Sequence, residues 1–133
     1  MERFDGIFIC TTKLFDRIDE AALRRFSFKL RFLPLTGPQR LRMFATEALG
    51  WLPDAAVTDV ADFDSEAARQ VEASHALRLN RLELLAPGDF AVVKRQSLLL
   101  GELPSPLEFL DQLEREHRAK PDVKLSKPVR FLR

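Results

Sequence analysis

Two adjacent arginines, Arg24 and Arg25, are the first residues whose type and spacing suggest chemistry. They close a short segment that opens on the acids Asp19 and Glu20, which predicts a helix with acid at its start and base at its end. A guanidinium group is a planar fork that meets phosphate oxygens in a bidentate way. The pair could therefore stabilise charge on a phosphoryl group. The alternative is that both are ordinary cations at the negative end of a helix dipole.

The segments on either side of this helix are expected to position the arginines as strands. Ile7, Phe8, Ile9 and Cys10 form an apolar run bounded by polar residues, typical of a strand covered on both faces. From Phe26 to Phe32 apolar and polar residues alternate strictly, which is the pattern of a half-exposed strand. Either Asp16 or Asp19 can cap the short helix between them.

The run from Gly6 to Phe26 resembles the second half of the nucleotide-binding domain of AAA+ ATPases. The string Asp-Glu-Ala-Ala-Leu-Arg-Arg-Phe at 19–26 carries the likeness. The resemblance implies that Arg24 and Arg25 are arginine fingers acting in trans on the nucleotide of a neighbouring subunit. It also places Thr12 and Lys13 at the sensor-1 tip, where the family commonly has Thr-Asn. Lys13 departs from that pattern, because a lysine cannot accept a hydrogen bond from the attacking water.

Two parts of such an ATPase are missing from the sequence. There is no glycine-rich loop ending in Gly-Lys-Ser/Thr, and no apolar strand ends in paired acids that could hold magnesium. An intact family member uses ATP and Mg²⁺, whereas this chain alone is expected neither to bind nor to hydrolyse ATP. The resemblance implies a partial P-loop NTPase α/β core of two strands over residues 1–35. In the family another strand lies between these two, so here they must splay, pair anew or borrow a partner's strand.

Residues 36–118 are expected to form the helical lid of the family. Thr36 and Gln39 read as a capping box for a helix over 38–49 that ends at Gly50. Its apolar stripe comprises Leu41, Phe44, Ala45 and Ala48, and its solvent face comprises Arg40, Arg42 and Glu47.

Further helices are expected along the rest of the lid. One starts at Asp64 or Ser65, and the leucine-rich segment from His75 to Leu85 is also expected to be helical. A last helix begins after Ser105 as N-cap, with Pro106 at its first position, and carries Leu107, Leu110 and Leu113 on its apolar side. The fold class is therefore mainly α with a small β element.

The string Ala86 to Ala91 reads as a turn followed by Asp89 as the N-cap of a helix that Gly101 stops. It also resembles the start of the lid helix that faces the nucleotide in AAA proteins. That resemblance implies a nucleotide-facing role for Gly88 and Asp89. The alternative is that both residues only cap the helix. Some branches of the family have a sensor-2 arginine about here, and this chain has Asp89 instead, so that role is unfilled.

Composition narrows the remaining function classes. A net charge of +1 over 133 residues gives no global case for nucleic acid or an anionic membrane, and a single cysteine excludes a disulfide framework. No apolar run approaches a membrane span and no signal peptide is evident, so a cytoplasmic location is expected. His75 and His117 lack further ligands at metal-site spacing, so no metal is expected. Residues 119–133 form a basic, proline-containing tail. Its residues Val129, Phe131 and Leu132 could dock as a short strand or hook, and a nucleic-acid arm is the less favoured alternative.

Together these features predict the C-terminal fragment of an AAA+ ATPase, which contributes arginine fingers and a lid to ATP-driven remodelling of a macromolecule. Its expected partners are further copies of itself or the missing N-terminal half of the ATPase core, and the remodelled macromolecule is unknown. The alternative from another class is a non-catalytic helical interaction module derived from an AAA+ protein.

Overall fold

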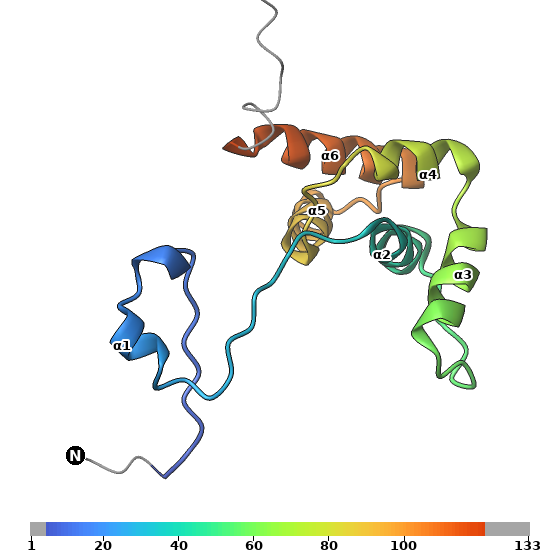
Figure 1. Ribbon diagram of the computed structural model, residues 1–133. Coiled ribbons are helices and arrows are strands. Elements are labelled where there is room, and N and C mark those ends of the chain that lie inside the picture. The colour runs from blue at the N-terminus through green and yellow to red at the C-terminus, as the bar shows by residue number, and fades with distance from the viewer. Residues whose placement is uncertain (1–4, 122–133) are drawn as a thin grey trace, which may run out of the picture. The chain divides into compact units, whose positions relative to one another are not determined.

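The computed structural model describes residues 5–121, which divide into an N-terminal unit ending at Phe32 and a helical unit beginning at Leu33. Helices are the only regular elements in this range, and no β-strand occurs in it (Figure 1). The prediction of a mainly α protein is therefore confirmed. The predicted tail hook at Val129, Phe131 and Leu132 lies outside the described residues.

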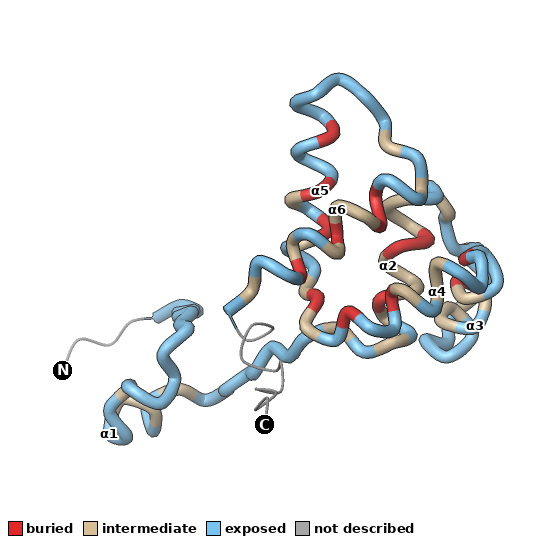
Figure 2. Tube along the Cα trace, turned by 90° about the horizontal axis from the view of Figure 1, so that it is seen from above, coloured by how far each residue is buried: buried red, intermediate tan, exposed pale blue. Residues whose placement is uncertain are grey.

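The N-terminal unit contains a 3₁₀ turn at Phe15–Arg17 and the short helix α1 at Glu20–Leu23. The rings of Phe8 and Phe26 stack with their centroids 6.2 Å apart, which closes the loop that holds both helical turns. None of residues 5–32 is buried, and the tube in Figure 2 is almost entirely exposed over this range. This unit therefore has no core of its own within its described part.

The two predicted strands, 6–10 and 26–32, do not form, and the two-strand P-loop core is wrong for the described chain. Their apolar side chains are open to solvent: Ile7 is 89% exposed and Phe32 92% exposed. A strand is stable only when its backbone groups are paired and its apolar face is covered. The described residues supply no strand that could pair with either segment, so neither condition is met.

The helical unit consists of α2 (Gly37–Leu49), α3 (Val60–Gln70), α4 (Ala73–Asn80), α5 (Pro87–Leu100) and α6 (Pro106–Ala119). Helix α2 is its centre and contacts each of the other four helices. In Figure 1, α2 and α5 lie side by side, α4 and α6 pass across them, and α3 packs beside α2.

The core of this unit is a cluster of apolar side chains from all five of its helices and the loop before α5. Phe109 lies at its middle, with its ring edge-on to Phe44 at 6.1 Å and tilted against Phe90 at 6.2 Å. The predicted stripe of α2 is confirmed, since Phe44 and Ala45 are fully buried and Leu41 and Ala48 pack against the cluster. The largest fully buried side chains are Phe44, Phe90, Leu79, Leu85, Leu110, Leu113 and Val93.

Local signals fix most of the helix ends where the sequence predicts them. Gly50 and Gly101 end α2 and α5 in the left-handed conformation, with φ of 66° and 71°. Gln39 Oε1 accepts from Thr36 N at 2.9 Å, which is the glutamine half of the predicted capping box. At α6, Ser105 Oγ accepts from the backbone N–H of Glu108, whose carboxylate accepts from Ser105 N at 2.7 Å.

Two helices differ from the expectation at one end. Helix α3 begins at Val60 rather than near residue 65, because Asp59 accepts from Ala61 N at 2.8 Å and caps the helix earlier. Asp64 instead pairs with Arg42 at 3.0 Å. Helix α4 ends at Asn80, so the apolar residues that follow it reach the core from a loop rather than from a longer helix.

Candidate functional site

The cations that the AAA+ resemblance singles out all lie on the surface of the N-terminal unit. Thr12 Oγ1 accepts from Leu14 N at 3.0 Å and so stabilises the turn that carries Lys13. Arg24 donates to Glu20 at 2.9 Å, and both side chains are highly exposed. Lys13 and Arg25 are exposed, and neither has an ion-pair partner among residues 5–121.

Arg24 and Arg25 follow α1 directly, and Arg24 is its C-cap. Their exposure means that binding an anion would require little removal of existing contacts. Arg25 is the readier of the two, because Arg24 would first have to leave Glu20. An arginine that acts on another molecule must be exposed in this way, but exposure alone does not distinguish that role from an ordinary surface charge.

Asp89 is part of a partly buried polar cluster at the start of α5, which we call the α5 hub. Contrary to the prediction, Ala86 is the N-cap and Asp89 is the third residue of the helix. The Asp89 carboxylate accepts from Ala86 N at 2.7 Å and from Lys120 Nζ at 2.6 Å. Lys120 also donates to Leu84 O at 2.5 Å, so it joins the end of α6 to the loop before α5.

His117 is the second member of the α5 hub, where its side chain is buried. Its Nε2 accepts a hydrogen bond from Leu84 N at 3.2 Å, which requires the neutral form of the ring. Burial lowers the pKa of His117, and the positive charges of Lys120 and Arg40 lower it further. The acids Asp89 and Glu83 oppose this shift without outweighing it.

Arg40 is the third member, and the prediction that it lies on the solvent face of α2 is wrong. Its guanidinium is buried and donates to Leu35 O at 2.7 Å and to Asn80 O at 3.2 Å. Leu35 N in turn donates to Leu85 O at 2.8 Å. Burial lowers the pKa of Arg40 despite the nearby charge of Glu83. Arg40 therefore fastens the segment entering α2 to the end of α4.

The structure places the predicted site residues in two groups: Thr12, Lys13, Arg24 and Arg25 in the N-terminal unit, and Gly88 and Asp89 in the helical unit. Gly88 is exposed, and a methyl group added there would meet nothing. The Asp89 side chain is only 15% exposed and already carries two hydrogen bonds, so its structural role is plain capping and pairing. A nucleotide-facing role for Gly88 and Asp89 stays a prediction.

Sequence reasoning missed the rest of the α5 hub. His117 continues the 3-4 apolar spacing of Leu110 and Leu113, and that spacing is a signal that could have placed it toward the core. Lys120 falls in the predicted tail, yet it contacts Asp89. No comparable signal marks Arg40, because lysines and arginines at the start of a helix usually face solvent.

No group of three or more His, Cys, Asp or Glu residues suited to a metal ion occurs between residues 5 and 121. The helices in this range are all too short or too polar to cross a membrane.

No protein family model, curated protein or solved structure matches the chain. The architecture defines a five-helix bundle that follows an exposed N-terminal unit carrying an arginine pair.

Proposed function

We propose that this chain is the C-terminal part of an AAA+ ATPase, with Arg24 and Arg25 acting as arginine fingers and residues 36–118 serving as the lid. The observation that carries the proposal is the exposure of the N-terminal unit. Its apolar segments have the sequence patterns of sheet strands, yet Phe28 is 86% exposed and Leu30 81% exposed. A segment of this kind is suited to joining strands supplied from outside the described residues.

The charge arrangement supports the same proposal. Arg25 is exposed beside the end of α1 and has no ion-pair partner among the residues described. In the proposed complex its guanidinium would contact the γ-phosphoryl group bound by a neighbouring subunit. Arg24 would join it by exchanging its contact with Glu20 for phosphate.

The described residues do not form a complete nucleotide site. The sequence lacks a phosphate loop, and Lys120, which contacts the start of α5, donates to Asp89 and Leu84. In the proposed ATPase, ATP and Mg²⁺ would therefore be held by residues outside the present sequence. No step of hydrolysis is assigned to residues of this chain beyond stabilisation of phosphoryl charge by its arginines.

The test is a complementation assay with the full chain. It would be mixed with a purified N-terminal half of an AAA+ core that carries the phosphate loop and the magnesium-binding acids, and ATP hydrolysis would be followed. We expect hydrolysis only in the mixture. Arg25→Ala should then lower turnover by about 10³-fold or more, as for loss of an arginine finger.

Arg17→Ala provides a matched control, because Arg17 is another exposed arginine of the same unit. It should leave the turnover of the mixture unchanged. A mixture that does not hydrolyse ATP, or one in which the Arg17 and Arg25 variants behave alike, would contradict the arginine-finger proposal.

A second function, a non-catalytic helical interaction module derived from an AAA+ protein, is favoured by two specific observations. Lys13 occupies the sensor-1 position, and the Asp89 carboxylate is engaged by Lys120. Such a module would act on a complete ATPase in trans. Adding the chain at saturating concentration should then change that ATPase's turnover, with the Arg25→Ala variant as effective as the unaltered chain.

A further inference from the structure

The end of α5 and the connector to α6 carry a group of leucines that the fold leaves in solvent. Leu99 is 81% exposed, Leu100 73% and Leu103 93%. Apolar side chains gathered at one place on a surface are typical of interaction sites, because monomers rarely leave large apolar patches uncovered. None of these leucines belongs to the core of the helical unit.

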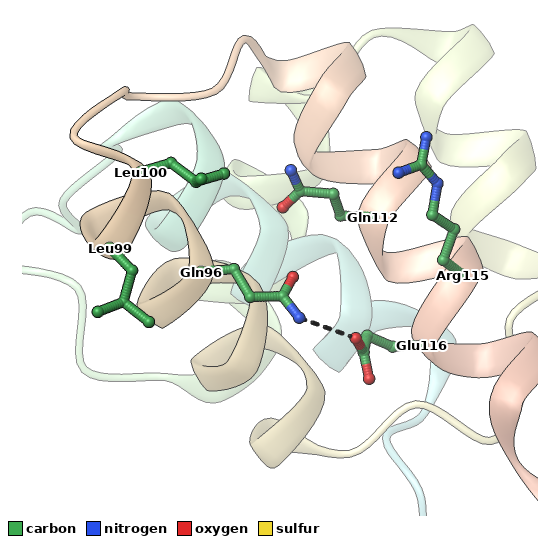
Figure 3. Close-up of a pocket in the computed structure, with 6 residues that line it drawn as sticks. All are labelled: Gln96, Leu99, Leu100, Gln112, Arg115 and Glu116. Carbon is green, nitrogen blue, oxygen red and sulfur yellow. Dashed lines mark hydrogen bonds between the residues drawn. The ribbon is translucent and has the colours of Figure 1, made fainter.

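These leucines line a shallow groove between α5 and α6, which we call the leucine groove. It consists of two adjoining hollows of about 430 and 230 Å³, which share Leu100, Gln112 and Arg115 in their linings. Figure 3 shows Leu99 and Leu100 on the α5 side of the larger hollow and Gln112, Arg115 and Glu116 on the α6 side. A groove between two packed helices is suited to the apolar face of a third helix.

The charged residues that line the leucine groove are mostly acidic. They comprise one arginine and four acids: Arg115, Glu102, Glu108, Asp111 and Glu116. Asp111 pairs with Arg78 of α4, so its charge is compensated. Each of the other three acids, like Arg115, has no ion-pair partner among residues 5–121. The groove therefore carries an excess of negative charge.

The hydrogen bonds of the unpaired acids leave that charge in place. Bonds from Ser105 lower the pKa of Glu108, so its carboxylate is ionised at neutral pH. Glu116 accepts from the neutral amide of Gln96 at 3.2 Å, and Glu102 is exposed. Because like charges repel, a nucleic acid or an anionic membrane surface is disfavoured at this groove, whereas a cationic partner is attracted.

Gln112 gives an independent indication of the partner's chemistry. It lines both hollows, and its buried amide oxygen accepts no hydrogen bond from the described residues. A buried acceptor without a donor is unfavourable. Lysine and arginine side chains offer donors and no acceptor, so a basic partner would be able to satisfy this oxygen.

We propose that the leucine groove binds a basic amphipathic helix of another protein. The apolar face of that helix packs on Leu99, Leu100 and Leu103, and its lysines or arginines lie at the acids Glu102, Glu108 and Glu116. This inference goes beyond the proposed function, because it uses none of the arginine-finger or nucleotide-facing residues and concerns the helical unit alone. It holds whether or not the chain belongs to an ATPase.

Fluorescence anisotropy with the full chain and labelled synthetic peptides tests this proposal. The first peptide is a helix of leucines and lysines in which the leucines share one face. A second peptide has glutamate in place of every lysine, and a third keeps the lysines but distributes the leucines around the helix. We expect the first peptide to bind and the other two to bind at least about 10-fold more weakly, because each lacks one of the two features that the groove requires.

A leucine variant with a matched control locates the bound peptide. Leu100→Ser should raise the dissociation constant of the first peptide by about 10-fold, because an apolar contact is lost. Leu77 is a 65% exposed leucine of α4 that lines neither hollow. Leu77→Ser should therefore leave the dissociation constant unchanged.

A charge variant tests the acidic lining in the same assay. Glu102→Lys should raise the dissociation constant by about 5-fold, because an attraction is replaced by a repulsion. Glu66→Lys makes the same change in net charge on α3, outside both hollows, and should have no such effect. Circular dichroism would verify that each variant keeps the helix content of the unaltered chain.

Four results would overturn the proposed site. They are failure of the first peptide to bind, as expected if a second copy covered the leucines; equal binding of the acidic peptide; unchanged binding in Leu100→Ser; and equal effects of the Glu102 and Glu66 changes.

Discussion

Mild acid should destabilise the helical unit through His117 while most carboxylates are still ionised. The neutral His117 ring accepts a hydrogen bond from Leu84 N through Nε2. Protonation would put a hydrogen on Nε2, so that two N–H donors would face each other. It would also add a positive charge near Lys120 and Arg40. The pKa of His117 is lowered on folding, so the unfolded chain binds the proton more readily. Stability contributed by the neutral ring is complete above the ordinary histidine pKa and falls as the pH drops below it.

The size of this loss follows from one proton. If the folded ring stays neutral, the free energy of unfolding falls by at most about 1.4 kcal/mol between about pH 7.5 and about pH 5.5, where an unfolded histidine of pKa about 6.5 becomes protonated. Urea unfolding followed by far-UV circular dichroism at several pH values in this window measures the loss. That signal reports the helical unit, which contains all the helices of eight or more residues in the described range.

The chain contains only two histidines, which supplies a matched control. In His117→Gln the side-chain oxygen can still accept from Leu84 N but does not titrate, so the dependence of stability on pH should flatten. His75 lies edge-on to Phe44 at 6.0 Å, and His75→Gln should keep the dependence of the unaltered chain. If the stability of the His117→Gln variant depended on pH as strongly as that of the unaltered chain, protonation of His117 would not be the cause of the acid destabilisation.

Three further predictions concern the stability of the helical unit, measured by urea unfolding. Gly101→Ala should lower the free energy of unfolding by about 1 kcal/mol, because residue 101 has φ of 71°. Gly88→Ala should not lower it, since the added methyl group meets open space. Arg40→Met should lower the free energy of unfolding by about 2–3 kcal/mol, because two backbone carbonyls lose a charged donor. A loss no larger than that caused by replacing an exposed arginine would contradict the anchoring role of Arg40. Ser105→Ala should lower the free energy of unfolding by about 1 kcal/mol, because α6 loses its N-cap, whereas Ser105→Asp should keep the cap and the stability of the unaltered chain.

The bundle was largely predictable because its helix ends are set by nearby residues. Gly50, Gly101 and Ser105 each act within one turn of the helix that they end or begin. The apolar stripe of α2 likewise follows from helical spacing alone. The start of α3 was missed because Asp59 and Asp64 are equally good caps in the sequence, and only the contact of Asp64 with Arg42 distinguishes them.

The long-range bonds of the α5 hub could not be predicted, because they join residues more than thirty positions apart. Lys120 reaches Asp89, and His117 reaches Leu84, only after α6 has packed beside α5. Nothing in the local sequence of Arg40 indicates that its guanidinium will meet Asn80 O across the unit. Burial of this guanidinium is offset by the bonds that two of its nitrogens donate to backbone carbonyls, while its buried Nε has no partner among the described residues.

The failed strands and the successful helices differ in where their hydrogen bonds must be found. A helix such as α2 satisfies its backbone within its own thirteen residues and needs neighbours only for one apolar face. The alternating segment from Phe26 to Phe32 specifies which side chains would share a face, but each of its backbone groups needs another strand. The described chain provides no such strand, so the alternation persists in the sequence without the element that it indicates. Under the proposed function, the strands that order this segment belong to the half of the ATPase core that carries the phosphate loop, and the complementation assay tests that requirement.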